Sequence, residues 1–132
     1  NGVTYITYCF AEIPGYSKIG SYDGNGNGNG TFVFCGFKPT FILIKNKSAS
    51  TDWHLFDSTR GGPASNIFGN PNKYFLKPNE SDAEGNETFD IYSNGFKPRI
   101  TNNFLNGSGD TLIYIAFGQT LVGSNNVPCT AR

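Results

Sequence analysis

The chain has 132 residues, enough for one domain with one hydrophobic core. Ten lysine and arginine residues balance ten aspartate and glutamate residues, so the long-range field that attracts nucleic acids or anionic membranes is missing. No run of about eighteen apolar residues occurs, and the first residues lack the pattern of a signal peptide. We therefore expect neither nucleic-acid binding nor membrane insertion. Because the chain starts at Asn1 without a methionine, we also expect it to be part of a longer product.

Short β-type runs follow one another at intervals of roughly ten residues, separated by turn-forming pairs such as Pro-Gly and Asn-Gly, and no segment has helical periodicity. The predicted strands are VTYITYCF from Val3, YSKIGSY from Tyr16, TFVFCGF from Thr31, TFILIKN from Thr40, WHLFDS from Trp53, KYFLK from Lys73, TFDIYS from Thr88, FKPRI from Phe96 and TLIYIAFG from Thr111. About nine strands with polar turns predict an all-β, antiparallel β-sandwich resembling a jelly roll over residues 1–120. Residues 121–132 read as an extended C-terminal tail.

The run from Thr111 to Phe117 is apolar on both faces of the predicted strand. Its two alternating sets are Leu112, Tyr114 and Ala116, and Ile113, Ile115 and Phe117. This pattern predicts a strand in the middle of the fold, or one between the core and a partner subunit.

The three cysteines are too few and too widely spaced for a disulfide framework or a zinc site. Cys9 and Cys35 fall in strand-like runs, which predicts buried thiols. Cys129 falls in the terminal tail, where we expect a free thiol.

The stretch SYDGNGNGNGT offers a possible calcium loop. Asp23, Asn25 and Asn27 match the first half of an EF-hand loop, but Phe34 occupies the position of the bidentate glutamate, and the flanks read as strands. No phosphate-binding glycine fingerprint is complete either. A mobile turn loop joining Tyr22 to Phe32 explains the stretch better, and a looser calcium site is the alternative. We expect no metal and no other cofactor.

Catalytic constellations are sparse. His54 is the single histidine, and no nucleophile-elbow motif accompanies it. The carboxylates Glu12, Asp52, Asp57 and Asp90 could in principle hydrolyse glycosidic bonds, but sequence does not give their separations. An ion pair between Asp57 and Arg60 that fixes the following loop is the simpler interpretation. We expect a protein that is not an enzyme.

Aromatic residues make up 15% of the chain, and most must fill the core. Some tyrosines lie beside glycine- and asparagine-rich loops, where an exposed ring can stack on a sugar while amides meet its hydroxyl groups. Core or interface packing is the alternative explanation. The candidate ligand-binding residues are Tyr22, Trp53, Asp57, Arg60 and Tyr74.

Four short motifs give the chain a family resemblance. They are Tyr-Cys-aromatic-x-Glu-x-x-Gly at Tyr8 to Gly15, Gly-Phe-basic-Pro at Gly36 to Pro39, Asp-Ser-x-Arg at Asp57 to Arg60 and Ser-Asn-Gly-Phe-Lys at Ser93 to Lys97. With them the chain resembles, over nearly its whole length, domains found toward the C-terminal ends of tail fibre and related tail proteins of tailed bacteriophages, notably marine ones. Two positions depart from the pattern: Phe10 replaces a frequent tryptophan, and Gly118-Gln119 replaces a common alanine-glutamate pair.

The resemblance implies a place on the virion tail, assembly in the host cytoplasm and a part in host attachment, with no established catalytic residues. The expected function is a non-enzymatic, trimeric tail fibre module that contacts other virion proteins and binds a bacterial surface glycan or other receptor through its loops. One alternative is a purely structural virion module, in a fibre or as capsid decoration, that mediates oligomerisation. The other is a glycan-degrading enzyme of the tailspike type.

Overall fold

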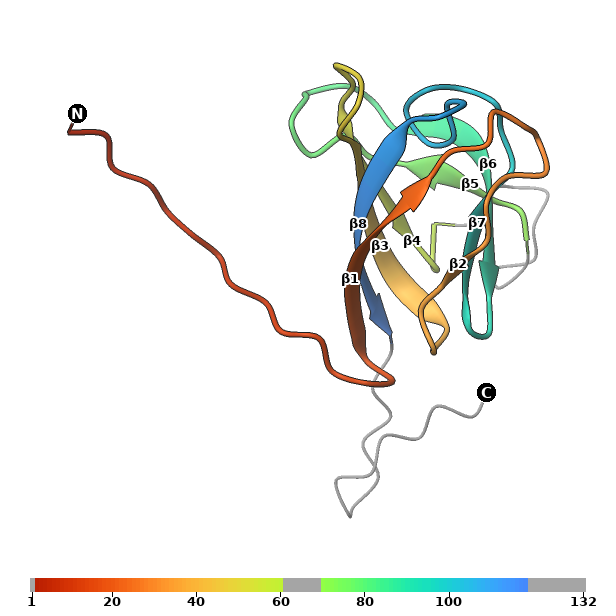
Figure 1. The fold of residues 1–132 in the computed structure, drawn as a ribbon, viewed down its shortest axis with the longest axis horizontal. Coiled ribbons are helices and arrows are strands. Elements are labelled where there is room, and N and C mark those ends of the chain that lie inside the picture. Colours follow the sequence, from red (N-terminus) through yellow and green to blue (C-terminus); the bar gives the residue numbers. More distant parts are fainter. Residues whose placement is uncertain (1, 61–69, 119–132) are drawn as a thin grey trace, which may run out of the picture.

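A computed structural model describes residues 2–60 and 70–118, and these residues form two antiparallel sheets packed face to face (Figure 1). The described strands are β1 (Ser17–Asp23), β2 (Val33–Phe34), β3 (Pro39–Asn46), β4 (Trp53–Asp57), β5 (Asn72–Phe75), β6 (Gly85–Tyr92), β7 (Gly95–Pro98) and β8 (Thr111–Gly118). The predicted all-β sandwich is therefore confirmed. The predicted tail over residues 121–132, with Cys129, lies outside the described residues. In the described ranges no helix is long and apolar enough to cross a membrane.

Sheet A has the strand order β1-β8-β3-β4, and sheet B has the order β2-β7-β6-β5. The predicted central position of the strand from Thr111 is confirmed, because β8 lies between β1 and β3. Its inward set, Leu112, Tyr114 and Ala116, is buried. Its outward set is only partly covered, with Ile113 still 39% exposed. The described residues of the single chain thus leave the apolar outer face of sheet A partly open.

Aromatic rings join the two sheets in the core. Phe56 of sheet A stacks on Phe89 of sheet B with ring centroids 4.2 Å apart, and Phe89 stacks on Phe96 at 5.3 Å. Phe96 then meets the edge of Tyr114 in sheet A at 5.3 Å. Such stacked and edge-on pairs contribute about 0.5–1.5 kcal/mol each beyond their buried area. This column of rings fixes how the sheets face each other.

One predicted strand is wrong. The segment Val3–Phe10 is extended and exposed, but it pairs with no strand in the described part of the chain and runs away from both sheets (Figure 1). The prediction of a buried Cys9 thiol fails with it, because Cys9 is exposed. Cys35 is buried as predicted, and burial raises the pKa of its thiol to about 12.

Candidate functional site

The glycine-asparagine loop between β1 and β2 is anchored by the buried side chain of Asn106, which is 0% exposed. Nδ2 of Asn106 lies 2.8 Å from three acceptors, namely Oδ1 of Asn25 and the carbonyls of Asn27 and Ile100. The Asn25 amide donates back to Oδ1 of Asn106 at 3.0 Å. The loop is therefore held by a buried side chain, where we expected a mobile turn.

The calcium candidates in this loop use their side-chain oxygens within the protein. Oδ1 of Asn25 accepts the amide of Asn27, Oδ1 of Asn27 accepts the amide of Asn29, and Oδ1 of Asp23 accepts the Thr111 hydroxyl. The two asparagine contacts are successive Asx turns, in which the side-chain oxygen faces the backbone, and the Asp23 oxygen faces the Thr111 side chain, so the three oxygens do not share a common centre. No group of three or more histidine, cysteine, aspartate or glutamate residues gathers in residues 2–60 and 70–118.

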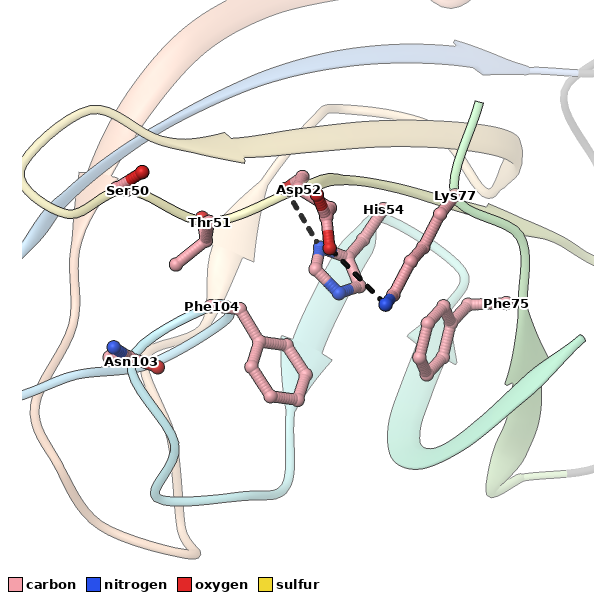
Figure 2. Close-up of a pocket in the computed structure, with 8 residues that line it drawn as sticks. All are labelled: Ser50, Thr51, Asp52, His54, Phe75, Lys77, Asn103 and Phe104. Atoms are coloured by element: carbon pink, nitrogen blue, oxygen red, sulfur yellow. Dashed lines mark hydrogen bonds and ion pairs between the residues drawn. The ribbon is translucent and has the colours of Figure 1, made fainter. Parts of the chain in front are cut away.

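A pocket of about 320 Å³ opens where the chain enters β4 and leaves β5 (Figure 2). This volume lies at the lower end of the range of about 300–1,000 Å³ that is usual for small-molecule sites. The lining residues are Ser50, Thr51, Asp52, His54, Phe75, Lys77, Asn103 and Phe104. The antiparallel bridge between Leu55 and Leu76 brings the two strand ends together, which places Asp52 and Lys77 on the same rim.

The inner wall of the pocket is formed by His54 and two phenylalanine rings. His54 is only 2% exposed; it stacks on Phe104 at 4.6 Å and tilts against Phe75 at 4.8 Å. Its Nδ1 lies 3.1 Å from the Asp52 carbonyl, which can only accept, so Nδ1 carries the proton. Burial lowers the pKa of His54 to about 4, against hydrogen bonding to Asp52, which raises it. The imidazole is therefore neutral near pH 7.

The rim of the pocket carries paired charges. Nζ of Lys77 lies 3.2 Å from Oδ2 of Asp52 and 2.9 Å from Oδ2 of Asp82. Hydrogen bonds from Asn79 and then Lys77 lower the pKa of Asp52, and hydrogen bonds to Asp82 and then Asp52 raise the pKa of Lys77. Both groups are charged at neutral pH and partly open to solvent. They present an acceptor and a donor side by side to any ligand that enters.

Thr51 supplies an unused polar atom. Its Oγ1 is buried and has no hydrogen-bond partner among the described residues, although a buried hydroxyl group normally has one. Nearby, Asn103 lies on the surface at the pocket, and Asn46 fixes its backbone by donating to its carbonyl. The pocket thus combines two ring faces, a charged pair and uncharged polar groups.

Tyr22 requires a correction. We expected it to contact a ligand, but its side chain is buried between the sheets, and its hydroxyl group donates to the Leu105 carbonyl at 2.8 Å. It also packs edge-on against Phe96. The sequence placed Tyr22 at the end of a strand but did not tell which face of that strand was covered.

The other four predicted ligand residues are not brought together in the pocket. Trp53 lies on the opposite face of β4 from His54, and its backbone amide donates to Oδ1 of Asn79. Tyr74 is half-buried in β5 and does not line the pocket. Asp57 and Arg60 form the predicted ion pair at 2.7 Å, which confirms the structural interpretation of that motif.

That ion pair extends into a small network. Arg60 also binds Glu84 at 2.7 Å, while Oδ1 of Asp57 accepts the amides of Thr59 and Arg60. Burial alone would raise the pKa of Asp57, but hydrogen bonds from Thr59 and Arg60 outweigh it and lower the pKa. These contacts are what is needed to hold a turn after β4.

Lys77, Thr51, Asn103 and the ring of Phe104 were missed as site residues, although Asp52 and His54 were considered. A signal was available in part: Asp52 directly precedes a predicted strand and Lys77 ends one, so both were candidates for a sheet end. Nothing in the sequence brought residues 101–105 to the same place.

Comparison with known proteins identifies the family but no activity. No curated protein and no solved structure matches the chain. A family model described as a domain of unknown function, DUF7483, matches residues 1–120. Because this match covers most of the chain, the protein belongs to the DUF7483 domain family.

Proposed function

We propose that this domain is a non-enzymatic attachment module of a phage tail fibre, which binds bacterial surface glycans in the pocket bounded by Asp52, Lys77 and Phe104. The observation that carries the proposal is the pocket itself, where ring faces lie beside charged and neutral hydrogen-bonding groups. Sugars need that combination, because each ring has an apolar face and a periphery of hydroxyl groups.

The individual groups support a hydroxyl-rich ligand. The Asp52 carboxylate accepts hydrogen bonds and the Lys77 ammonium group donates them. Both groups are partly exposed, so each can form a further hydrogen bond with a ligand. The buried Thr51 hydroxyl group gains a partner only if a ligand or water reaches it. Phe104 and Phe75 provide apolar contact on the inner side (Figure 2).

A glycan-degrading enzyme fits these residues less well. Asp52 and Asp82 both touch Nζ of Lys77, so two carboxylates do lie close together. A glycosidase, however, needs one acid with a raised pKa to protonate the leaving group, and the pKa of Asp52 is lowered. His54 is enclosed by rings, and burial lowers its pKa to about 4, so its imidazole is a weak and poorly accessible general base. These features favour binding over hydrolysis.

The placement on a tail fibre is supported by the four sequence motifs. Two of them have a structural explanation: Asp57 to Arg60 forms the end of β4 and the turn after it, and Ser93 to Lys97 forms the turn after β6 and the first residues of β7. A purely structural virion module is the second candidate, favoured by the exposed apolar segment Val3–Phe10.

The test is binding of the chain to an array of bacterial surface polysaccharides. We expect Lys77→Ala and Asp52→Ala each to weaken binding about tenfold or more, because each removes a charge-assisted hydrogen bond. Lys73→Ala is the matched control, since Lys73 lies in β5 outside the pocket, and it should bind normally.

Two results would contradict the proposal. Binding that survives both substitutions would place recognition elsewhere. Release of reducing ends from a bound polysaccharide by the unmodified chain, abolished by Asp52→Ala, would identify an enzyme.

A further inference from the structure

The segment Val3–Phe10 has the composition of a strand but pairs with no strand among residues 2–60 and 70–118. It contains β-branched and aromatic residues and no charge. Tyr5 and Ile6 are each 81% exposed, and Tyr8 is 79% exposed. A contiguous exposed apolar segment of this kind marks a contact surface.

An unpaired strand edge is available on the same molecule. β1 is the outermost strand of sheet A, and β8 occupies one side of it. The Ile19 amide points to the other side, where it donates to Oε1 of Glu12 at 3.0 Å. By strand alternation the amide of Ser21 faces the same open edge, and Ser21 is exposed. Natural proteins normally cover such an edge.

The segment does not pair with β1 of its own chain, although a hairpin begins there. Ile13 and Ser17 form an antiparallel bridge, and the next pair would place Ala11 opposite Ile19. The Glu12 carboxylate takes the Ile19 amide instead, and the Ser17 hydroxyl donates to the Ala11 carbonyl at 2.9 Å. The chain leaves the sheet at this point and runs outward (Figure 1).

We propose that Val3–Phe10 of one copy adds as an extra strand to the open edge of β1 in a second copy. At about 3.3 Å per residue its eight residues span about 26 Å, enough to cover the part of the β1 edge that stays open beyond the Ile13–Ser17 bridge. Pairing gives its backbone groups partners and covers the edge of β1. The occupant is a second copy, because this chain supplies both halves of the contact.

The side chains fit this addition as well as the backbone. Across the outer face of sheet A the register aligns Ile19, Ile115, Leu43 and Leu55 in one apolar row. A strand added beside Ile19 lengthens this row with aromatic and β-branched side chains. Phe10 already lies against this face, with its ring 5.8 Å from that of Phe117. The inference is independent of the glycan pocket, which lies at the other edge of sheet A.

The experiment measures the mass of the full chain in solution by light scattering over about 10–100 μM. We expect an oligomer. Ser21→Pro should convert it to a monomer, because proline removes the amide at the open edge without touching the β1–β8 ladder. The double variant Ile6→Asp, Tyr8→Asp should do the same, and its sites are so exposed in the single chain that the fold cannot depend on them.

Phe34→Asp is the control, because it places one aspartate on another exposed apolar residue, in sheet B, and it should leave the oligomer intact. Circular dichroism checks that each variant is folded. A monomeric unmodified chain would overturn the proposal. An oligomer that survives the segment double variant would overturn it too. If Ser21→Pro does not fold, the double variant alone decides.

Discussion

The glycine-asparagine loop and the chain segments that line the pocket lie toward the same end of the sandwich (Figure 1). Both carry polar side chains, yet they differ in how those side chains are used. In the loop, side-chain oxygens of Asn25 and Asn27 accept amides of the chain, and Asn106 closes the network from inside. In the pocket, the Thr51 hydroxyl group has no hydrogen-bond partner within the described part of the chain, and the Asp52–Lys77 pair is partly exposed to solvent. The polar side chains of the loop therefore hold the chain itself, whereas those of the pocket keep hydrogen-bonding capacity that a ligand can use.

The largest effect should follow from breaking the loop network. Asn106→Ala removes the donor and acceptor that satisfy Asn25, Asn27 and Ile100, so four part-buried hydrogen bonds are lost together. We expect a loss of about 3–4 kcal/mol in the free energy of unfolding, measured with urea. Asn29→Ala, at an exposed position of the same loop, should change it by less than about 0.5 kcal/mol. Similar values for the two variants would show that the loop is not anchored.

The burial of His54 in the pocket can be tested through the pH dependence of the free energy of unfolding. Because the pKa of His54 is about 4 in the folded protein against 6.5 as its ordinary value, the unfolded chain takes up the proton first. The stability that the neutral His54 contributes is therefore fully present above pH 6.5 and is lost as the pH falls toward 4. We expect the free energy of unfolding to drop by about 2–3 kcal/mol between pH 7.5 and 4.5.

His54→Phe keeps a ring against Phe104 and removes the titrating group. It should abolish most of the dependence in this pH window, because the lowered pKa values of Asp52 and Asp57 place their own titration at lower pH. A variant with the full pH dependence would show that another group is responsible.

Substitutions at two glycines distinguish the anchored base of the loop, at Gly24, from its tip, at Gly28. A Cβ on Gly24 would lie 2.2 Å from the Gly107 carbonyl oxygen, whereas a Cβ on Gly28 meets nothing within 4 Å. We expect Gly24→Ala to lower the unfolding free energy by about 2–3 kcal/mol and Gly28→Ala to leave it nearly unchanged. Thermal unfolding of both variants measures this. Equal melting temperatures would mean that the base of the loop can move away.

The smallest effect on stability should come from Thr51, which lines the pocket. Thr51→Val replaces a buried hydroxyl group that has no partner with a methyl group, so the unfolding free energy should rise by up to about 1 kcal/mol. Glycan binding on the polysaccharide array should fall at the same time. A loss of stability would show that the hydroxyl group is satisfied in solution, most simply by water.

Much of the fold could be predicted because alternation is a local signal. The runs at Thr40, Trp53 and Thr111 became β3, β4 and β8, with His54 and Phe56 inward and Trp53 outward. Val3–Phe10 has an equally good strand pattern but failed, since a strand also requires a neighbour, and the sequence does not state where that neighbour is.

The candidate site was less predictable, because it depends on contacts between distant residues. The Asp57–Arg60 pair is only three residues apart and was found correctly. The pocket brings together Asp52, Lys77 and Phe104, which are far apart in the sequence. Similarly, Tyr22 is buried by residues that lie far from it in the sequence. Burial and unsatisfied hydrogen-bond groups become visible only in three dimensions.

The contrast between the two described cysteines provides a chemical reporter. Cys35 is buried and its thiol keeps its proton, so it should resist thiol reagents. Cys9, in the segment Val3–Phe10, is exposed in the single chain and should react. With Cys129 replaced by serine, a maleimide dye would report on Cys9 alone. If Val3–Phe10 pairs with β1 of a second copy, the rate at which the dye attaches to Cys9 would report how often the segment leaves that edge.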